Sequence, residues 1–312
     1  MRKKIFNILG LLISLICFLF ILRTIFLIEF DWNILKDKMG IFCMLTVISA
    51  ISILLVTNAW ANILNFIEYK DVSKSTLSSV YIKANIAKYL PGNVMNLIGR
   101  NVMAGKLGFK QTNITISTII EIIFFAFTTI ILSLIFSIHK IKYIISIIYQ
   151  YINFSFIISI IIIIFILLIV ITVYKKYIYV KTDKYIKQIK KFITLDFAKL
   201  SIKLFILYAL YFFILGCLLV IVINNVLNIK INLYDASSII GFYVLSFFIG
   251  YITPGAPGGI GIRDTVIIVL LSSVVGTSVA IISSLIHRII TIVGDIIIFL
   301  FSYIIFRKQN NS

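Results

Sequence analysis

Long apolar runs alternate with short polar segments along nearly the whole chain. Several runs, Ile152–Val173 among them, carry no charged residue over more than about 18 positions, and a helix of that length crosses the roughly 30 Å hydrocarbon core of a bilayer. The pattern predicts an all-α fold, a polytopic transmembrane helical bundle of about eight spans. The expected spans are 5–28, 41–64, 114–138, 144–173, 204–225, 236–252, 265–276 and 279–306.

Two of these segments differ from an ordinary crossing. Segment 144–173 is longer than one crossing needs, so we expect it to tilt or to begin at the interface. Segment 265–276 is short, and we interpret it as a half-helix that is broken from the last span near Gly276.

Basic residues lie mainly between the apolar runs. The loop from Tyr174 to Lys203 holds nine lysines, whereas the 29–40 and 226–235 loops are nearly balanced in charge. Because Lys and Arg accumulate in cytoplasmic loops, this distribution predicts that both termini are cytoplasmic in a multi-pass protein of the cell membrane.

Composition supports a membrane protein and narrows its partners. Hydrophobic residues make up 61% of the chain and charged residues 13%, with a net charge of +18. The basic residues follow the membrane pattern and form no recognisable nucleic-acid module, so we expect contact with the bilayer and its anionic phospholipids but not with nucleic acid. We expect one integral membrane domain over 1–312 and no soluble catalytic domain.

All three prolines fall in two stretches that resemble neither clean spans nor ordinary loops. These are Lys88–Arg100 and Thr253–Asp264, each with Pro-Gly first and an arginine later. Proline and glycine break helices, and a bilayer tolerates broken backbone only where it is buried in protein or lines a wet cavity. We therefore predict two re-entrant or broken segments, with tight turns between helices as the alternative. The residues expected to form turns or cavity walls are Pro91, Gly92, Gly99, Pro254, Pro257, Gly258, Gly259 and Gly261.

Charged and amide side chains in and near these stretches could bind a ligand. A guanidinium matches the geometry of phosphate or carboxylate, and intramembrane charges face a bundle interior or water. The candidate substrate-binding residues are Lys88, Asn93, Asn96, Arg100, Arg263 and Arg288, and the candidate charge-balancing residues are Glu121, Asp264 and Asp295.

Arg288 and Asp295 are seven residues apart and so share one helix face, where they could line a polar track with Thr291 and Arg263. A structural ion pair with another helix is the alternative. Only two histidines occur, and no common nucleotide, hydrolase or metal motif is present. We predict no catalytic residue, no metal site and no cofactor.

The two stretches resemble signatures of the lysylphosphatidylglycerol synthase transmembrane-region family. Lys88–Arg100 is similar to the first, and Pro257–Asp264 to the second, with Asp264 in place of the usual Glu. Glu121 and Arg288 resemble charged residues of the intervening and last spans. The resemblance implies a flippase-like domain. It also implies that lysyltransferase activity would need a soluble C-terminal synthase domain, for which we expect no counterpart in this sequence.

These observations favour a lipid flippase or translocase that binds an anionic lipid or a lipid-linked head group. The alternative is a membrane subunit or an enzyme of lipid modification, in aminoacyl-phosphatidylglycerol synthesis or lipid-linked glycosyl transfer. A separate synthase or glycosyltransferase is then a possible partner. Independent catalysis is not expected, because Asp264 is the one acidic residue within the two Pro-Gly stretches.

Overall fold

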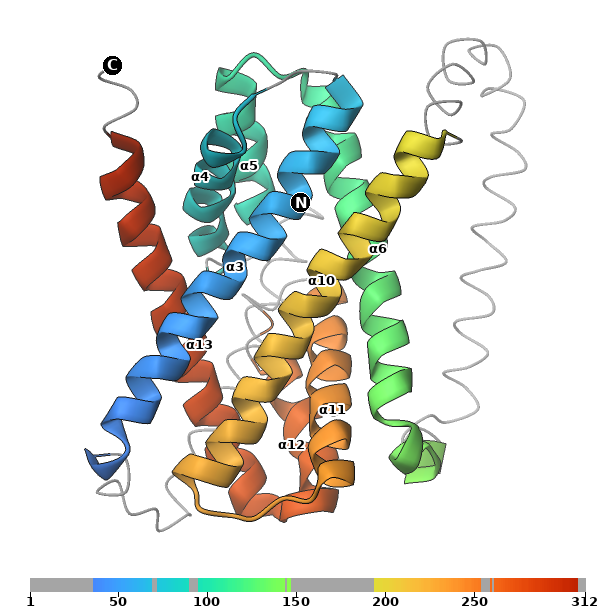
Figure 1. The fold of residues 1–312 in the computed structure, drawn as a ribbon, viewed down its shortest axis with the longest axis vertical. Coiled ribbons are helices and arrows are strands. Elements are labelled where there is room, and N and C mark those ends of the chain that lie inside the picture. Colours follow the sequence, from blue (N-terminus) through green and yellow to red (C-terminus); the bar gives the residue numbers. More distant parts are fainter. Residues whose placement is uncertain are drawn as a thin grey trace, which may run out of the picture. The chain divides into compact units, whose positions relative to one another are not determined.

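The protein is described from a computed structural model that covers residues 36–68, 72–89, 95–143, 145–146, 194–253, 259 and 261–307 (Figure 1). The expected span 5–28, nearly all of 144–173 and the three prolines lie outside the described residues. The residues that are described form helices and no strand, which confirms the all-α fold.

Five described helices are long and apolar enough to cross a membrane. They correspond to the spans expected at 41–64, 114–138, 204–225, 236–252 and 279–306, while the total of about eight stays a prediction. The helices are α3 (Met39–Glu68), α6 (Gln111–Phe136), α10 (Leu195–Ile221, continued by the π-helix η5, Val222–Val226), α11 (Leu233–Ile252) and α13 (Thr277–Arg307).

Shorter helices flank the two Pro-Gly stretches. The first stretch overlaps η1 (Ile86–Tyr89), which continues α4 (Lys74–Asn85), and α5 (Met95–Lys106). The second leads into α12 (Ile262–Val275), whose 14 residues span about 21 Å, too short for a crossing. Gly276, with φ of 80°, separates α12 from α13, so the break expected near Gly276 is confirmed.

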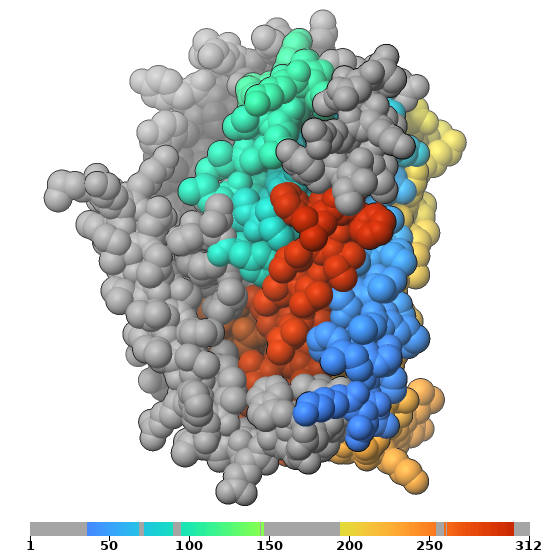
Figure 2. All heavy atoms as spheres, turned by 90° about the vertical axis from the view of Figure 1, so that its left-hand side faces the viewer, coloured from blue at the N-terminus to red at the C-terminus, as the bar shows by residue number. Residues whose placement is uncertain are grey.

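The chain divides into two compact units, one of Met1–Ile138 with Leu204–Ser312 and one of His139–Lys203. A single membrane domain over the whole chain therefore stays a prediction. Within the first unit, α4 and α5 lie toward one end of the long helices, and α12 lies toward the other (Figure 1). Helix α13 packs against α3, α4 and α12, and Figure 2 shows it in red between α3 in blue and the α4–α5 region in teal and green.

Small residues allow these helices to approach closely, as is usual where apolar lipid gives little drive for helix association. A Cβ added to Gly294 of α13 would lie 3.0 Å from the Ser49 hydroxyl of α3. A Cβ added to Gly250 of α11 would lie 2.7 Å from the Cβ of Arg263 on α12. Both glycines thus fix the spacing of helices that surround the site described next.

Candidate functional site

A cavity of about 90 Å³ lies in the first unit, where both interrupted regions meet the long helices. One water needs roughly 10–15 Å³ on this measure, so the cavity has room for several waters or a small polar group. Its wall combines aromatic, hydroxyl and charged side chains. The polar and charged members are Ser49, Ser52, Tyr81, Asn85, Lys88, Tyr89, Asn96, Arg100, Glu121, Tyr211, Tyr243, Tyr251, Arg263, Arg288, Thr291 and Asp295.

Glu121 of α6 anchors both helices around the first Pro-Gly stretch. It forms an ion pair of 2.5 Å with Arg100 of α5 and accepts a 2.8 Å hydrogen bond from the Tyr81 hydroxyl of α4. Arg100 and Glu121 are each 2% exposed. Burial alone lowers the pKa of the Arg100 guanidinium, but the Glu121 carboxylate outweighs it and raises that pKa above its ordinary value. Arg100 is therefore charged, and its charge is compensated within the protein.

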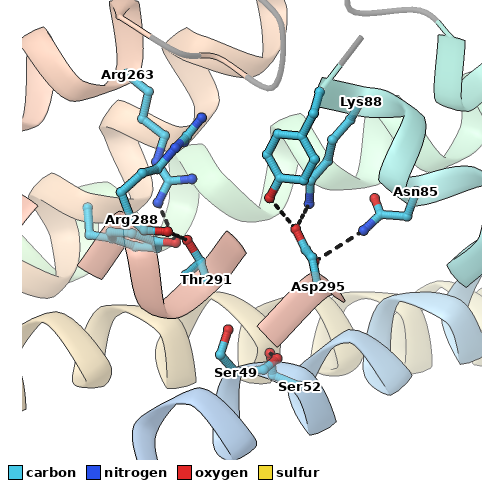
Figure 3. A network of polar contacts seen from close by, with 10 residues as sticks. Ser49, Ser52, Asn85, Lys88, Arg263, Arg288, Thr291 and Asp295 are labelled. Atoms are coloured by element: carbon cyan, nitrogen blue, oxygen red, sulfur yellow. Dashed lines mark hydrogen bonds and ion pairs between the residues drawn. The ribbon is translucent and has the colours of Figure 1, made fainter. Parts of the chain in front are cut away.

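Asp295 of α13 anchors the end of α4 and η1 (Figure 3). The Lys88 ammonium lies 2.6 Å from the carboxylate, Asn85 donates at 3.3 Å, and the Tyr89 hydroxyl donates a short hydrogen bond to the same group. Burial first, and then the Asp295 carboxylate, raise the pKa of Tyr89, so its hydroxyl keeps the proton that it donates. Three donors from one segment therefore hold that segment to α13.

Arg263, at the start of α12, has a different environment. Its guanidinium lies over the rings of Tyr243 and Phe247, 4.7 and 4.6 Å from their centres, and it donates a 2.8 Å hydrogen bond to the Tyr243 hydroxyl. Within the described part of the chain, Arg263 has no carboxylate partner within 4.0 Å. The residue is only 8% exposed. Its buried charge is thus held by aromatic faces and one hydroxyl.

The neighbouring ring positions are fixed by further contacts. His287 of α13 packs edge-on against Tyr243, with ring centres 4.8 Å apart, and hydrogen-bonds the Leu215 carbonyl of α10 at 3.0 Å. Three helices therefore determine where Tyr243 stands, and through it where the guanidinium of Arg263 lies.

The cavity wall carries an excess of positive charge. Figure 3 shows Arg263 and Arg288 near Thr291, apart from the group around Asp295. Among the described lining residues, four are basic (Lys88, Arg100, Arg263 and Arg288) and two are acidic (Glu121 and Asp295), an excess of two positive charges. Both acidic residues already form ion pairs. Arg263, which has no carboxylate partner among the described residues, therefore suits an anion, because a buried charge without a counter-charge is costly.

Most sequence-predicted residues that the structure describes meet at this cavity. They are Lys88, Asn96, Arg100, Glu121, Gly259, Arg263, Arg288 and Asp295. The Arg288–Asp295 spacing places both side chains on the wall with Thr291. Asp295 pairs with a residue of another helix, as the alternative interpretation held.

Three predicted residues are not on the cavity wall. Asp264 is not on the wall, because its carboxylate accepts the Gly261 backbone N–H at 3.2 Å and so caps the N-terminus of α12. Gly261, with φ of 88°, lies in the turn that precedes that helix, in agreement with its prediction as a turn residue. Gly99 lies inside α5 and not in a turn. A Cβ added there would lie 3.4 Å from the Cβ of Ala84, so the glycine allows α4 and α5 to pack closely. Other predicted residues lie outside the described part of the chain: Pro91, Gly92, Asn93, Pro254, Pro257 and Gly258.

Sequence reasoning missed the aromatic and amide residues that hold the charges. Tyr81, Asn85 and Tyr89 bind the two anchoring carboxylates, and Tyr243 and Phe247 hold Arg263. A helical spacing could have found the first three, since 81, 85, 88 and 89 recur at three to four residues and so share one face of α4 and η1. Tyr243 and Phe247 are likewise four residues apart on α11, but no charged residue close to them in the sequence marks them as part of a site.

Comparison with known proteins adds a family. The family model described as "Lysylphosphatidylglycerol synthase TM region" matches residues 7–298, most of the chain. Comparisons with curated proteins and with solved structures gave no match.

Proposed function

The chain belongs to the lysylphosphatidylglycerol synthase transmembrane-region family, and from this membership we propose that it is a lipid translocase. It binds the head group of an anionic lipid, or of a lipid-linked substrate, in the cavity between the two interrupted regions. The long apolar helices, with exposed side chains such as Ile51, Ile123 and Phe127, face the acyl chains.

One observation carries the proposal: Arg263, on the cavity wall, has aromatic partners but no carboxylate within 4.0 Å among the described residues. A guanidinium offers five N–H donors in a planar fork that suits phosphate. Arg263 gives one hydrogen bond to the described residues, to Tyr243. An entering phosphate would supply the missing counter-charge and accept further donors.

The cavity offers the lipid phosphate a polar location at intramembrane depth. Hydroxyls of α3 and α13, from Ser49, Ser52 and Thr291, extend the polar wall beyond the arginines (Figure 3). A head group that moves between the two membrane surfaces needs such a location, because charged groups are costly in hydrocarbon. The two short helical regions at opposite ends of the first unit are the segments we expect to move when access changes sides.

A role as an enzyme or subunit of lipid modification receives less support from the same wall. A carboxylate that acts as a general base must be able to take a proton, and both acidic residues of the described wall are engaged by cations. The family's name refers to lysylphosphatidylglycerol synthesis, but we do not propose lysyltransferase activity for this membrane domain.

Translocation in proteoliposomes of the full chain tests the proposal. Head-labelled phosphatidylglycerol in the outer leaflet is bleached by a membrane-impermeant reagent, and the fraction that becomes protected reports inward movement. We expect Arg263→Gln to slow translocation about tenfold or more, the cost of losing a charge-assisted hydrogen bond. Lys106→Gln, which removes the same charge from an exposed position of α5, should leave the rate unchanged. Equal rates for wild type and Arg263→Gln would refute the proposal.

A further inference from the structure

The tyrosines of the cavity wall differ in what their hydroxyls do. Tyr81 and Tyr89 donate their protons to the two carboxylates of the wall. Tyr243 faces a cation instead, because its hydroxyl oxygen accepts a 2.8 Å hydrogen bond from the Arg263 guanidinium. The described part of the chain offers the proton of the Tyr243 hydroxyl no acceptor within hydrogen-bond distance. Tyr243 therefore keeps a donor that the fold does not use.

Packing fixes the position of this donor. Tyr243 is 1% exposed and lines the cavity, and its ring is held edge-on by His287 and packs against Phe247. A phenol has one proton, and a guanidinium N–H directed at its oxygen requires that proton to point elsewhere. A buried donor without a partner is costly, so a group that enters the cavity is a favourable acceptor.

We infer that Tyr243 binds the head group directly, with its hydroxyl and the Arg263 guanidinium both donating to the same anionic group. This inference rests on the proposed function and adds a second ligand-binding residue to that site. A hydroxyl that accepts a hydrogen bond from a cation is polarised by it and becomes a better donor. Two adjacent donors, both held in place before the ligand arrives, match the several acceptor oxygens of a phosphodiester.

A role of Tyr243 in positioning Arg263 alone leads to a different expectation. If the hydroxyl served only to orient the guanidinium, its removal would matter only while Arg263 is present. If the hydroxyl contacts the ligand, its removal weakens binding with or without Arg263. A double-mutant cycle over the two positions separates these roles. Tyr243→Phe suits the cycle, because it keeps the ring that contacts Arg263 and His287 and should therefore preserve the packing.

Titrations of the purified full chain with phosphatidylglycerol in detergent test the inference. We expect Tyr243→Phe to lower the affinity about tenfold, the effect of losing one hydrogen bond to a charged group. In the Arg263→Gln background the same change should lower the affinity by a further factor of about five or more. Tyr208→Phe is the matched control, since Tyr208 is fully buried and does not line the described cavity, and it should leave the affinity unchanged.

The outcomes separate the inference from the proposed function. Wild-type affinity in Tyr243→Phe, together with weakened binding in Arg263→Gln, would overturn the inference and leave the proposed function standing. A loss that disappears in the Arg263→Gln background would make Tyr243 a positioning residue only, and an equal loss in Tyr208→Phe would show no role specific to the wall. Either result overturns the inference. Failure of the wild type to bind phosphatidylglycerol would overturn both. Inorganic phosphate that binds as tightly as the lipid would contradict the lipid source.

Discussion

The two interrupted regions treat their arginines in opposite ways. Around the first, Arg100 is neutralised by Glu121, and Lys88 by Asp295, so that α4, η1 and α5 are held to α6 and α13 by charge. Around the second, Arg263 stands between aromatic rings with one hydroxyl partner. Both arginines are buried and both follow a Pro-Gly in the sequence. Arg100 therefore serves the fold, and we propose that the charge of Arg263 is available to a ligand.

The two stretches are similar in sequence, but the environments of their arginines differ. A buried ion pair that loses one member leaves a charge stranded, which costs far more than the pair contributes. A buried charge that never had a partner can be removed at little cost or with a gain. Removing a charge from the first region should therefore lower stability strongly. Removing the Arg263 charge should change stability little but weaken ligand binding.

The largest effect on stability should follow Glu121→Gln. Arg100, at 2% exposure, would keep its charge without a carboxylate, and we expect a loss of about 3–5 kcal/mol in unfolding free energy. Thermal or denaturant unfolding in detergent measures it. The double variant Arg100→Met/Glu121→Leu should recover most of the loss. Loss of no more than about 1 kcal/mol in the single variant would show that the pair does not hold α5.

A smaller and local effect should follow Asp295→Asn. Lys88 can still reach water, because its side chain is 24% exposed, so the variant mainly weakens charge-assisted hydrogen bonds, at about 1.5–3 kcal/mol. Hydrogen exchange should accelerate over 81–89 and stay unchanged over 262–275. Asp37→Asn, at an exposed position, is the control. Equal acceleration in both regions would mean that Asp295 stabilises the fold at large and not this segment.

Gly250→Ala sharpens the comparison from the side of the second region. The added methyl would lie 2.7 Å from the Arg263 Cβ, so α12 must shift, at about 1–3 kcal/mol. Binding of anionic lipid should weaken with it, because the guanidinium moves. Gly40→Ala, with nothing within 4 Å, should change neither quantity appreciably. Unchanged lipid affinity in Gly250→Ala would mean that the position of Arg263 does not matter for binding.

The smallest effect on stability should follow Arg263→Gln. Removing a buried charge that has no carboxylate partner among the described residues should change the unfolding free energy by less than about 1 kcal/mol, or raise it. Anionic lipid binding, measured by native mass spectrometry, should fall about tenfold or more in the same variant. A destabilisation comparable to that of Glu121→Gln would assign Arg263 a structural role.

The sequence predicted where the helices lie better than which side chains pair between them. Apolar runs located the five long described helices, and the short length of 265–276 with Gly276 located a broken helix, because burial and backbone freedom are local properties. Arg100 and Arg263 looked equivalent from the motif alone. Their difference depends on Glu121, 21 residues away, and on Tyr243, 20 residues away in the other direction. Such pairings depend on how helices pack, and no local pattern reveals them.

Unfolding of the wild type and Arg263→Gln, each with and without anionic lipid, tests the central claim that the Arg263 charge is reserved for a ligand. Phosphatidylglycerol and phosphatidic acid are added in separate series. A ligand that binds the folded state should stabilise it by about 2.7 kcal/mol at a hundred times its Kd, which unfolding can measure. We predict that the variant is at least as stable as the wild type without lipid, and that lipid stabilises only the wild type. A variant that is less stable without lipid, yet gains as much from it, would contradict the account.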